Sequence, residues 1–205
     1  AKLIYGSGVD ASFFKSAKTL DKPSFLFIGR LLKSKGVREF VQASKELSKS
    51  HDVRIQMVGS YESRHPDSIS PDLYKELQQA SYLEYHGYSD QVKSYIEESS
   101  IVVLPSYREG LSISILESMS MGKAILVSNV AGCRDFFDFE YKPGLMTVVR
   151  SSNSLKECME LMCAMDKDQL NDFGQSGRLL VEKYFEVKII NKQLIDLINQ
   201  QFEQA

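Results

Sequence analysis

Short apolar runs alternate along this chain with longer segments of helical periodicity. Runs such as SFLFIGR (24–30), DVRIQMVG (52–59) and SIVVLPS (100–106) each have the length of one buried strand. Between them, apolar residues recur at helical spacing, as in residues 35–49 and 70–81. Strands that alternate with helices form parallel βαβ units. The sequence therefore predicts an α/β fold with a doubly wound, Rossmann-like parallel sheet of six strands and helices on both faces.

The three remaining strands are expected at residues 82–87, 123–128 and 144–149. Only helical periodicity follows residue 150, and no internal repeat is visible. We expect one domain over residues 1–205, divided into a linker segment (1–22), a Rossmann-like core (23–150) and a tail of C-terminal helices (151–205).

Composition narrows the classes of partner. The 205 residues are 43% hydrophobic and 25% charged, with a formal net charge of −2. This balance does not favour nucleic acid, so local cations must hold any anionic ligand. The longest apolar runs are too short to span a bilayer, and no secretory signal is visible. The three cysteines lack metal-ligand spacing, which indicates buried, reduced thiols in a cytosolic protein.

The segment GRLLKSKG (29–36) is the first candidate site, because ligands of doubly wound sheets bind at the carboxyl ends of the strands. Gly29 and Arg30 end the first predicted strand, and Lys35 opens the next helix. A guanidinium offers a planar fork of donors, an ammonium a mobile charge, and a helix N-terminus a partial positive charge. This turn is a candidate diphosphate site, and a solvated basic turn is the alternative.

Other signatures are missing or point to structure. The chain has neither a G-x-x-x-x-G-K-[ST] loop nor a G-x-G-x-x-G after its first strand. Asp166 and Asp168 form an Asp-x-Asp at the start of a late helix, which we interpret as capping and dipole compensation. His86 ends the third predicted strand, and a structural role is expected for it. No metal site is predicted.

The segment SYREGLSISILESMSMGK (106–123) is the second candidate site. Gly110 allows close backbone approach to a ligand, and a helix begins near Leu111 or Ser112 with free amides. Glu109 lies at the mouth of the site. Glu117 follows about two turns into an apolar helix, with no cation three or four residues away. A buried carboxylate there requires hydrogen bonds, such as those of a ribose diol, unless the glutamates are exposed.

Together these segments resemble the C-terminal, nucleotide-sugar-binding half of GT-B glycosyltransferases of the retaining family 4. The resemblance covers about residues 3–140, and the Glu109-to-Glu117 spacing matches the family's E-x7-E signature. It is similar in detail to bacterial N-acetylgalactosaminyltransferases of lipid-linked oligosaccharide assembly. Five stretches carry it: YGSGVDASFF, FIGRLLKSKG, IQMVGS, YHGYSDQVKSYIEESSIVVLPSYREG and EGLSISILESMSMGKAILVS.

The resemblance implies a role for each matching residue. Arg30 and Lys35 hold the donor diphosphate, Glu109 contacts the donor sugar, and Glu117 holds the ribose hydroxyls; Arg30, Lys35 and Glu109 are the catalytic candidates. The other implied donor-binding positions lie at strand ends and at the helix start: Gly29, Tyr88, Ser89, Gly110, Leu111 and Ser112. Two departures stand out, because many relatives have Phe-Gly or Phe-Pro at residues 111–112 and a glutamate within the CRD stretch (133–135).

The implied activity is retaining transfer of a hexose or N-acetylhexosamine from a nucleotide diphosphate sugar, with UDP expected. The acceptor is a glycan or a polyprenyl-diphosphate-linked sugar. Neither a cofactor nor a metal is expected. The acceptor-binding N-terminal domain is absent from these 205 residues, so we expect nucleotide binding with little transfer. The full-length protein is expected in the cytoplasm, at the inner face of the plasma membrane.

Three alternatives differ in chemistry. A GT-B-fold nucleotide-sugar 2-epimerase requires a different set of carboxylates and histidines. A non-catalytic α/β binding module is disfavoured because the arginine, the lysine and both glutamates are present. A Rossmann dehydrogenase is disfavoured by the missing glycine fingerprint.

Overall fold

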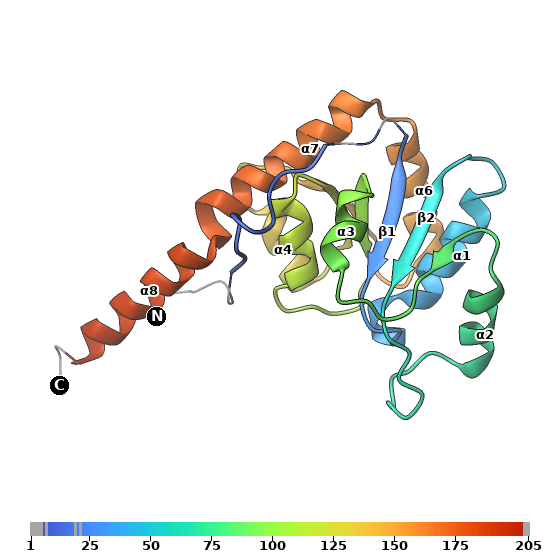
Figure 1. Ribbon diagram of the computed structural model, residues 1–205, viewed down its shortest axis with the longest axis horizontal. Coiled ribbons are helices and arrows are strands. Elements are labelled where there is room, and N and C mark those ends of the chain that lie inside the picture. Colours follow the sequence, from blue (N-terminus) through green and yellow to red (C-terminus); the bar gives the residue numbers. More distant parts are fainter. Residues whose placement is uncertain (1–5, 7, 19, 21, 203–205) are drawn as a thin grey trace.

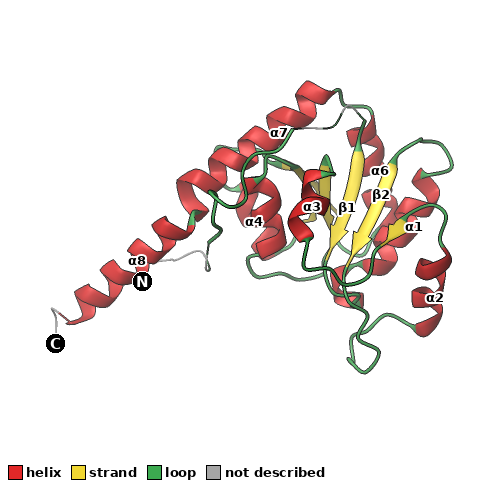
Figure 2. Ribbon diagram, viewed as in Figure 1, coloured by secondary structure: helices red, strands yellow, loops and turns green. Residues whose placement is uncertain are grey.

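A single parallel sheet organises the molecule. The computed structural model describes residues 6, 8–18, 20 and 22–202, so part of the predicted linker segment lies outside the described residues. The strand order is β3-β2-β1-β4-β5-β6. The strands are β1 (Ser24–Ile28), β2 (Arg54–Val58), β3 (Glu84–Tyr85), β4 (Ile101–Leu104), β5 (Ala124–Ser128) and β6 (Gly144–Thr147). This is the predicted six-stranded doubly wound sheet, drawn in yellow between red helices in Figure 2.

Helices cover both faces of the sheet, which explains why the central strands are apolar without alternation. In Figure 1, α3 and α4 lie in front of the sheet, and α1 and α6 lie behind it. Phe25 of β1 faces the core under α1 and α6, whereas its neighbour Leu26 faces the core under α3 and α4. The helices are α1 (Val37–Leu47), α2 (Pro71–Gln79), α3 (Val92–Glu97), α4 (Ile113–Ser120), α5 (Ala131–Arg134), α6 (Ser152–Cys163), α7 (Lys167–Leu180) and α8 (Val187–Phe202).

Local capping sets where two of the predicted helices begin. The Ser70 side chain accepts a hydrogen bond from the Leu73 amide, so α2 begins at the expected cap. Asp166 accepts from the Gln169 amide at 2.8 Å, and the Gln169 side chain bonds back in a capping box. This confirms the capping interpretation of the Asp-x-Asp stretch.

The third strand is much shorter than predicted. Residues 82–87 were expected to be extended, but β3 contains only Glu84 and Tyr85. Gly87 adopts a left-handed conformation with φ 69°, which turns the chain. Its carbonyl accepts from the Gly59 amide at 2.8 Å, so the loops after β2 and β3 are joined.

The C-terminal helices form a kinked rod. A π-helical segment, Val181–Phe185, separates α7 from α8. The Val9 amide donates to the Phe185 carbonyl at 2.9 Å, and the Val187 amide donates to the Val9 carbonyl at 3.0 Å. The N-terminal segment is therefore fastened to the kink, and α8 extends away from the sheet beyond it (Figure 1).

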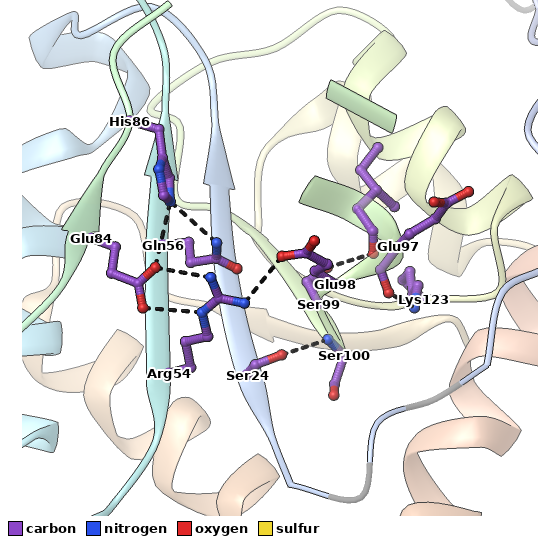
Figure 3. A network of polar contacts seen from close by, with 11 residues as sticks. Ser24, Arg54, Gln56, Glu84, His86, Glu97, Glu98, Ser99, Ser100 and Lys123 are labelled. Atoms are coloured by element: carbon purple, nitrogen blue, oxygen red, sulfur yellow. Dashed lines mark hydrogen bonds and ion pairs between the residues drawn. The ribbon is translucent and has the colours of Figure 1, made fainter. Parts of the chain in front are cut away.

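A polar network lies along β2, β3 and α3. The Arg54 guanidinium bonds the Glu84 carboxylate at 3.0 and 2.9 Å and Glu98 at 3.2 Å (Figure 3). His86 lies one residue beyond β3, with its Nε2 3.2 Å from Nε2 of the buried Gln56. His86 thus joins a cross-strand network, as its expected structural role requires.

Candidate functional site

The candidate site lies where the strand order reverses, between β1 and β4. Ligands of open α/β sheets bind at this point, outside the carboxyl ends of the strands. The loops after β1 and β4 touch there, because the Tyr107 amide donates to the Ser34 carbonyl at 2.7 Å. Gly36, with φ 72°, brings α1 so close that an added Cβ would lie 2.1 Å from the Pro105 oxygen. Both predicted motifs therefore open onto one edge of the sheet.

Lys35 and Glu109 form an ion pair across these two loops. Their side chains are only 25% and 10% exposed, respectively. The Ser106 hydroxyl donates to the same Glu109 oxygen at 2.7 Å. A shielded pair of this kind is held more firmly than a surface pair. The two residues come from the two separate predicted motifs, and the fold brings them into direct contact.

Arg30 is placed differently from Lys35. Its side chain is 54% exposed, and its guanidinium lies 3.7 Å from the Glu62 carboxylate in the loop after β2. The structure therefore keeps Arg30 at the same edge of the sheet but outside the Lys35–Glu109 contact. An exposed ion pair of this length contributes little to stability, so Arg30 is free to change partners.

Glu117 is half-buried on α4 and lacks a partner. Burial raises the pKa of its carboxyl group, and no other cause contributes. Within the described part of the chain its carboxylate makes neither a hydrogen bond nor an ion pair. The unpaired glutamate inferred from helical spacing is thus found, and its charged form is disfavoured in the free protein.

The start of α4 presents uncapped amides to the site. Ser112 occupies the N-cap position, but its side chain caps no amide and instead lies 3.1 Å from the Ser114 hydroxyl. Leu111 is half-buried and lies against Gly6 of the N-terminal segment. Gly110 has no atom within 4 Å of a hypothetical Cβ, so nothing in the fold itself requires glycine there. Free amides beside open space can accommodate an anion.

The remaining predicted positions line neighbouring strand ends. Gly29 donates its amide to the Val58 carbonyl at 3.0 Å, and an added Cβ on Gly59 would meet the Gly29 oxygen at 1.8 Å. Tyr88 is 71% exposed, and its hydroxyl donates to Asp90. Ser89 accepts a hydrogen bond from the Gln91 amide at 3.1 Å. Gly29 is therefore packed in the loop cluster, whereas Tyr88 and Ser89 lie at its exposed border.

The α5 turn packs against the turn that carries Glu109 and Gly110. The sequence analysis did not assign a role to it. A Cβ on Gly132 would lie 1.8 Å from the Gly110 oxygen, so the turn that carries Glu109 rests directly on this glycine. Burial raises the pKa of the adjacent Cys133 thiol to about 12, and the Glu109 charge adds to this effect. Cys133 is fully buried, as predicted, whereas Cys158 and Cys163 are only half-buried. The only sequence feature that drew attention to the α5 turn was the CRD stretch (133–135), where many relatives have a glutamate.

Lys123 is a second residue that sequence reasoning missed. It is 1% exposed, and its ammonium donates to the Glu97 carbonyl at 3.0 Å (Figure 3). The same ammonium donates to the Lys18 carbonyl at 3.1 Å. Burial lowers its pKa to about 8. Lys123 ties the N-terminal segment to the end of α3, a structural role away from the Lys35–Glu109 pair.

The described residues contain neither a metal-ion cluster nor a membrane-spanning helix. In that part of the chain, no cluster of three or more His, Cys, Asp or Glu side chains is arranged to hold a metal ion. Likewise, none of its helices combines the length and the apolar composition needed to cross a bilayer.

Comparison with known sequences identifies related proteins. The family model for "Glycosyl transferases group 1" matches residues 9–180. A relative in Campylobacter jejuni, N,N'-diacetylbacillosaminyl-diphospho-undecaprenol alpha-1,3-N-acetylgalactosaminyltransferase, is 31% identical over 159 residues. That match covers 78% of this chain but 40% of the relative. The chain thus spans less than half the length of this relative.

Comparison with solved structures supports the same fold. Sucrose-phosphate synthase from Thermosynechococcus elongatus superimposes with a TM-score of 0.81 at 21% identity, covering 98% of this chain and 53% of that one. Anabaena Alr3699/HepE, solved in complex with UDP, gives a TM-score of 0.81 at 18% identity, with coverage of 97% and 57%. The described sheet and helices therefore have the architecture of one half of these larger chains.

Proposed function

This chain belongs to the glycosyl transferases of group 1, and we propose that it is the donor-binding half of a retaining GT-B glycosyltransferase. The proposed donor is a UDP-linked hexose or N-acetylhexosamine. The proposed acceptor is a glycan or a polyprenyl-diphosphate-linked sugar. The C. jejuni relative is named as an N-acetylgalactosaminyltransferase acting on N,N'-diacetylbacillosaminyl-diphospho-undecaprenol, and the Anabaena protein was solved with UDP.

The observation that carries this proposal is the contact between Lys35 and Glu109 at the strand-order reversal. One cation and one carboxylate, from different loops, meet where ligands of such sheets bind. The uncapped start of α4 follows Glu109 directly along the chain, and the partnerless Glu117 lies further along the same helix. In the proposal, Lys35 and the α4 amides hold the diphosphate, Glu109 the sugar, and Glu117 the ribose.

The proposed reaction breaks the bond between the sugar C1 atom and the diphosphate oxygen. Negative charge develops on the departing UDP, where Lys35, Arg30 and the α4 amides stabilise it. The acceptor oxygen forms the new bond to C1 from the face that UDP leaves, so configuration is retained. The acceptor proton passes to the departing diphosphate. The cations take the part that a divalent metal plays in Asp-x-Asp enzymes, so UDP binding is expected to be unchanged by EDTA.

The acceptor site is proposed to lie in another part of the full-length protein. The chain covers 40% of the C. jejuni relative. Three apolar side chains of α8, Leu194, Ile195 and Ile198, are 40–57% exposed on the helix that extends from the sheet. Exposed apolar faces of this kind favour contact with a further domain. We place the full-length protein in the cytoplasm, at the inner face of the plasma membrane.

Thermal unfolding with UDP, GDP, ADP and NAD tests the proposal. A nucleotide that binds the folded chain raises its Tm by mass action, and UDP alone is expected to do so. Stabilisation by NAD alone would contradict the proposal. Calorimetric titration of UDP into Arg30→Ala and Glu117→Ala then tests the site, with Lys49→Ala as a control that removes a surface cation paired with Glu46. Weakened binding is expected in the first two variants only, and the isolated chain should transfer little or no sugar.

A further inference from the structure

Two contacts join the first turn of α1 and the 3-10 turn before it (Lys33–Lys35) to the turn after β4. Lys35 pairs with Glu109. Four residues after Lys35, Glu39 accepts a hydrogen bond at 2.8 Å from the hydroxyl of Tyr107, which lies two residues before Glu109. Because the Tyr107 amide also donates to the Ser34 carbonyl at 2.7 Å, Tyr107 is held by both its main chain and its side chain.

A third loop closes over this tyrosine. The Arg150 guanidinium carbon, from the loop after β6, lies 4.7 Å from the centre of the Tyr107 ring, a cation–π distance. Arg150 has φ 58°, and no other non-glycine residue in the described part of the chain has a positive φ. A bulky residue keeps such a conformation only where its surroundings hold it there. The contact with Tyr107 is a reason for this strain.

The Tyr107 hydroxyl is a partly buried hydrogen-bond donor. Burial and the neighbouring Glu39 raise its pKa to about 12, against the opposing charges of Arg150 and Arg38. The hydroxyl is protonated at neutral pH, as an ordinary tyrosine is, and it donates to Glu39. The second carboxylate oxygen of Glu39 is buried without a hydrogen-bond partner among the described residues, so this carboxylate depends on the hydrogen bond from Tyr107 to its other oxygen.

We propose that Tyr107, held by Glu39 and Arg150, is a positioning residue that sets the geometry of Lys35 and Glu109 for the donor. The inference rests on the proposed function, because it takes these two residues to be the donor contacts. The turn over residues 105–112 has no regular structure of its own. Its anchors therefore decide where the Glu109 carboxylate lies, and small displacements of binding groups weaken positioning.

The chain contains a matched control for this contact. The Tyr82 hydroxyl donates to the Glu76 carboxylate at 2.9 Å, and the Lys45 ammonium lies 5.7 Å from the centre of its ring. Tyr82 precedes β3, so it lies near the amino ends of the strands, whereas the candidate site lies at their carboxyl ends. Tyr107→Phe and Tyr82→Phe thus remove the same kind of hydrogen bond, one near the site and one far from it.

Calorimetric titration with UDP and with UDP-N-acetylgalactosamine tests the inference on the 205-residue chain. We expect Tyr107→Phe to weaken binding of the sugar nucleotide by about three- to tenfold, the effect of one net hydrogen bond, and Tyr82→Phe to leave it unchanged. Tyr107→Phe should lose more thermal stability than Tyr82→Phe, because Glu76 keeps its bond from Lys45 whereas Glu39 loses the hydrogen bond from Tyr107. Arg150→Gly relieves the strained backbone, so it should keep or raise the Tm while weakening binding.

A double-mutant cycle separates positioning from general destabilisation. If Tyr107 acts through Glu109, the effect of Tyr107→Phe should disappear in a Glu109→Gln background. Equal affinities for Tyr107→Phe and Tyr82→Phe, or additive losses in the double variant, overturn the inference while the proposed function stands. A wild-type chain that binds neither UDP nor the sugar nucleotide overturns both.

Discussion

Replacing Glu117 by glutamine should separate the effect of this residue on folding stability from its proposed effect on nucleotide binding. The carboxylate is half-buried and unpartnered within the described residues, and burial raises its pKa. Glutamine keeps the size of the side chain but removes the charge. We expect Glu117→Gln to increase the free energy of unfolding at pH 7 by about 1 kcal/mol, at the low end of the range for an unsatisfied buried group, because the site is only half-buried.

The pH dependence of this gain has a defined sign. A carboxyl group whose pKa is higher in the folded state binds more protons when folded than when unfolded. Its contribution to stability therefore falls as the pH rises from the unfolded-state pKa to the folded-state pKa. Below the unfolded pKa both states are protonated, and the penalty vanishes. The stability advantage of Glu117→Gln should therefore be smallest near pH 4 and grow toward pH 7.

Nucleotide binding should change in the opposite direction. Hydrogen bonds from ribose hydroxyls to a carboxylate are charge-assisted, and each is worth about 1.5–3 kcal/mol. Loss of the charge should weaken UDP binding by about 10- to 100-fold. The same substitution is thus expected to stabilise the free protein and to weaken UDP binding. This combination is common where a binding site contains a buried polar group that has no partner in the free protein.

Two measurements decide the outcome. Thermal unfolding between pH 4 and pH 8 should show a rise in Tm of about 2–4 °C near neutral pH for a chain of this size, and calorimetry measures the UDP affinity. Glu160→Gln on α6 is the control, because it removes a partly exposed helix carboxylate paired with Lys156. Lower stability at pH 7 together with unchanged UDP affinity would refute the assignment of Glu117.

Further expectations concern the loops and the buried lysine. Gly110→Ala should leave stability within about 0.5 kcal/mol and weaken sugar-nucleotide binding measured by calorimetry, because only ligand space is filled. Gly132→Ala should lower the free energy of unfolding by about 1–3 kcal/mol, since its Cβ meets a backbone carbonyl; equal stability of the two glycine variants would contradict this. Lys35→Met should cost about 2 kcal/mol in denaturant unfolding by leaving the Glu109 charge unpaired, and adding Glu109→Gln should recover part of it. Lys123 has a folded pKa of about 8, below its unfolded value, so the folded state binds fewer protons above that pH. Wild-type stability should therefore rise relative to Lys123→Met between pH 7 and pH 9, and a pH-independent difference would contradict this.

The fold was largely predictable because its signals are local. Strands buried on both faces appear as continuous apolar runs, and helices appear as periodic stripes between them. Capping residues such as Ser70 and Asp166 marked helix starts within one turn. The error at residues 82–87 also has a local cause, since apolar content does not reveal that Gly87 takes a left-handed conformation.

The candidate site was only partly predictable. Spacing within one helix was enough to show that Glu117 lacks a cation, because positions three and four residues away are neighbours on a helix. Spacing could not reveal that Glu109 pairs with Lys35, 74 residues away, and that Arg30 does not take part in this pair. Nor could it reveal Gly132 beneath the Glu109 turn or Arg150 over Tyr107, because each contact joins loops of different βαβ units.

The sequence by itself determined the secondary elements, their parallel arrangement, the family resemblance and the two loops where binding residues gather. These depend on periodicity and on motifs that are each continuous along the chain. The tertiary structure decided which side chains from those loops face one another: Lys35 with Glu109, Arg30 with Glu62, and Tyr107 with Glu39. The physical reason is that parallel strands bring their carboxyl ends to one edge, so loops distant in sequence become neighbours only when the sheet has formed.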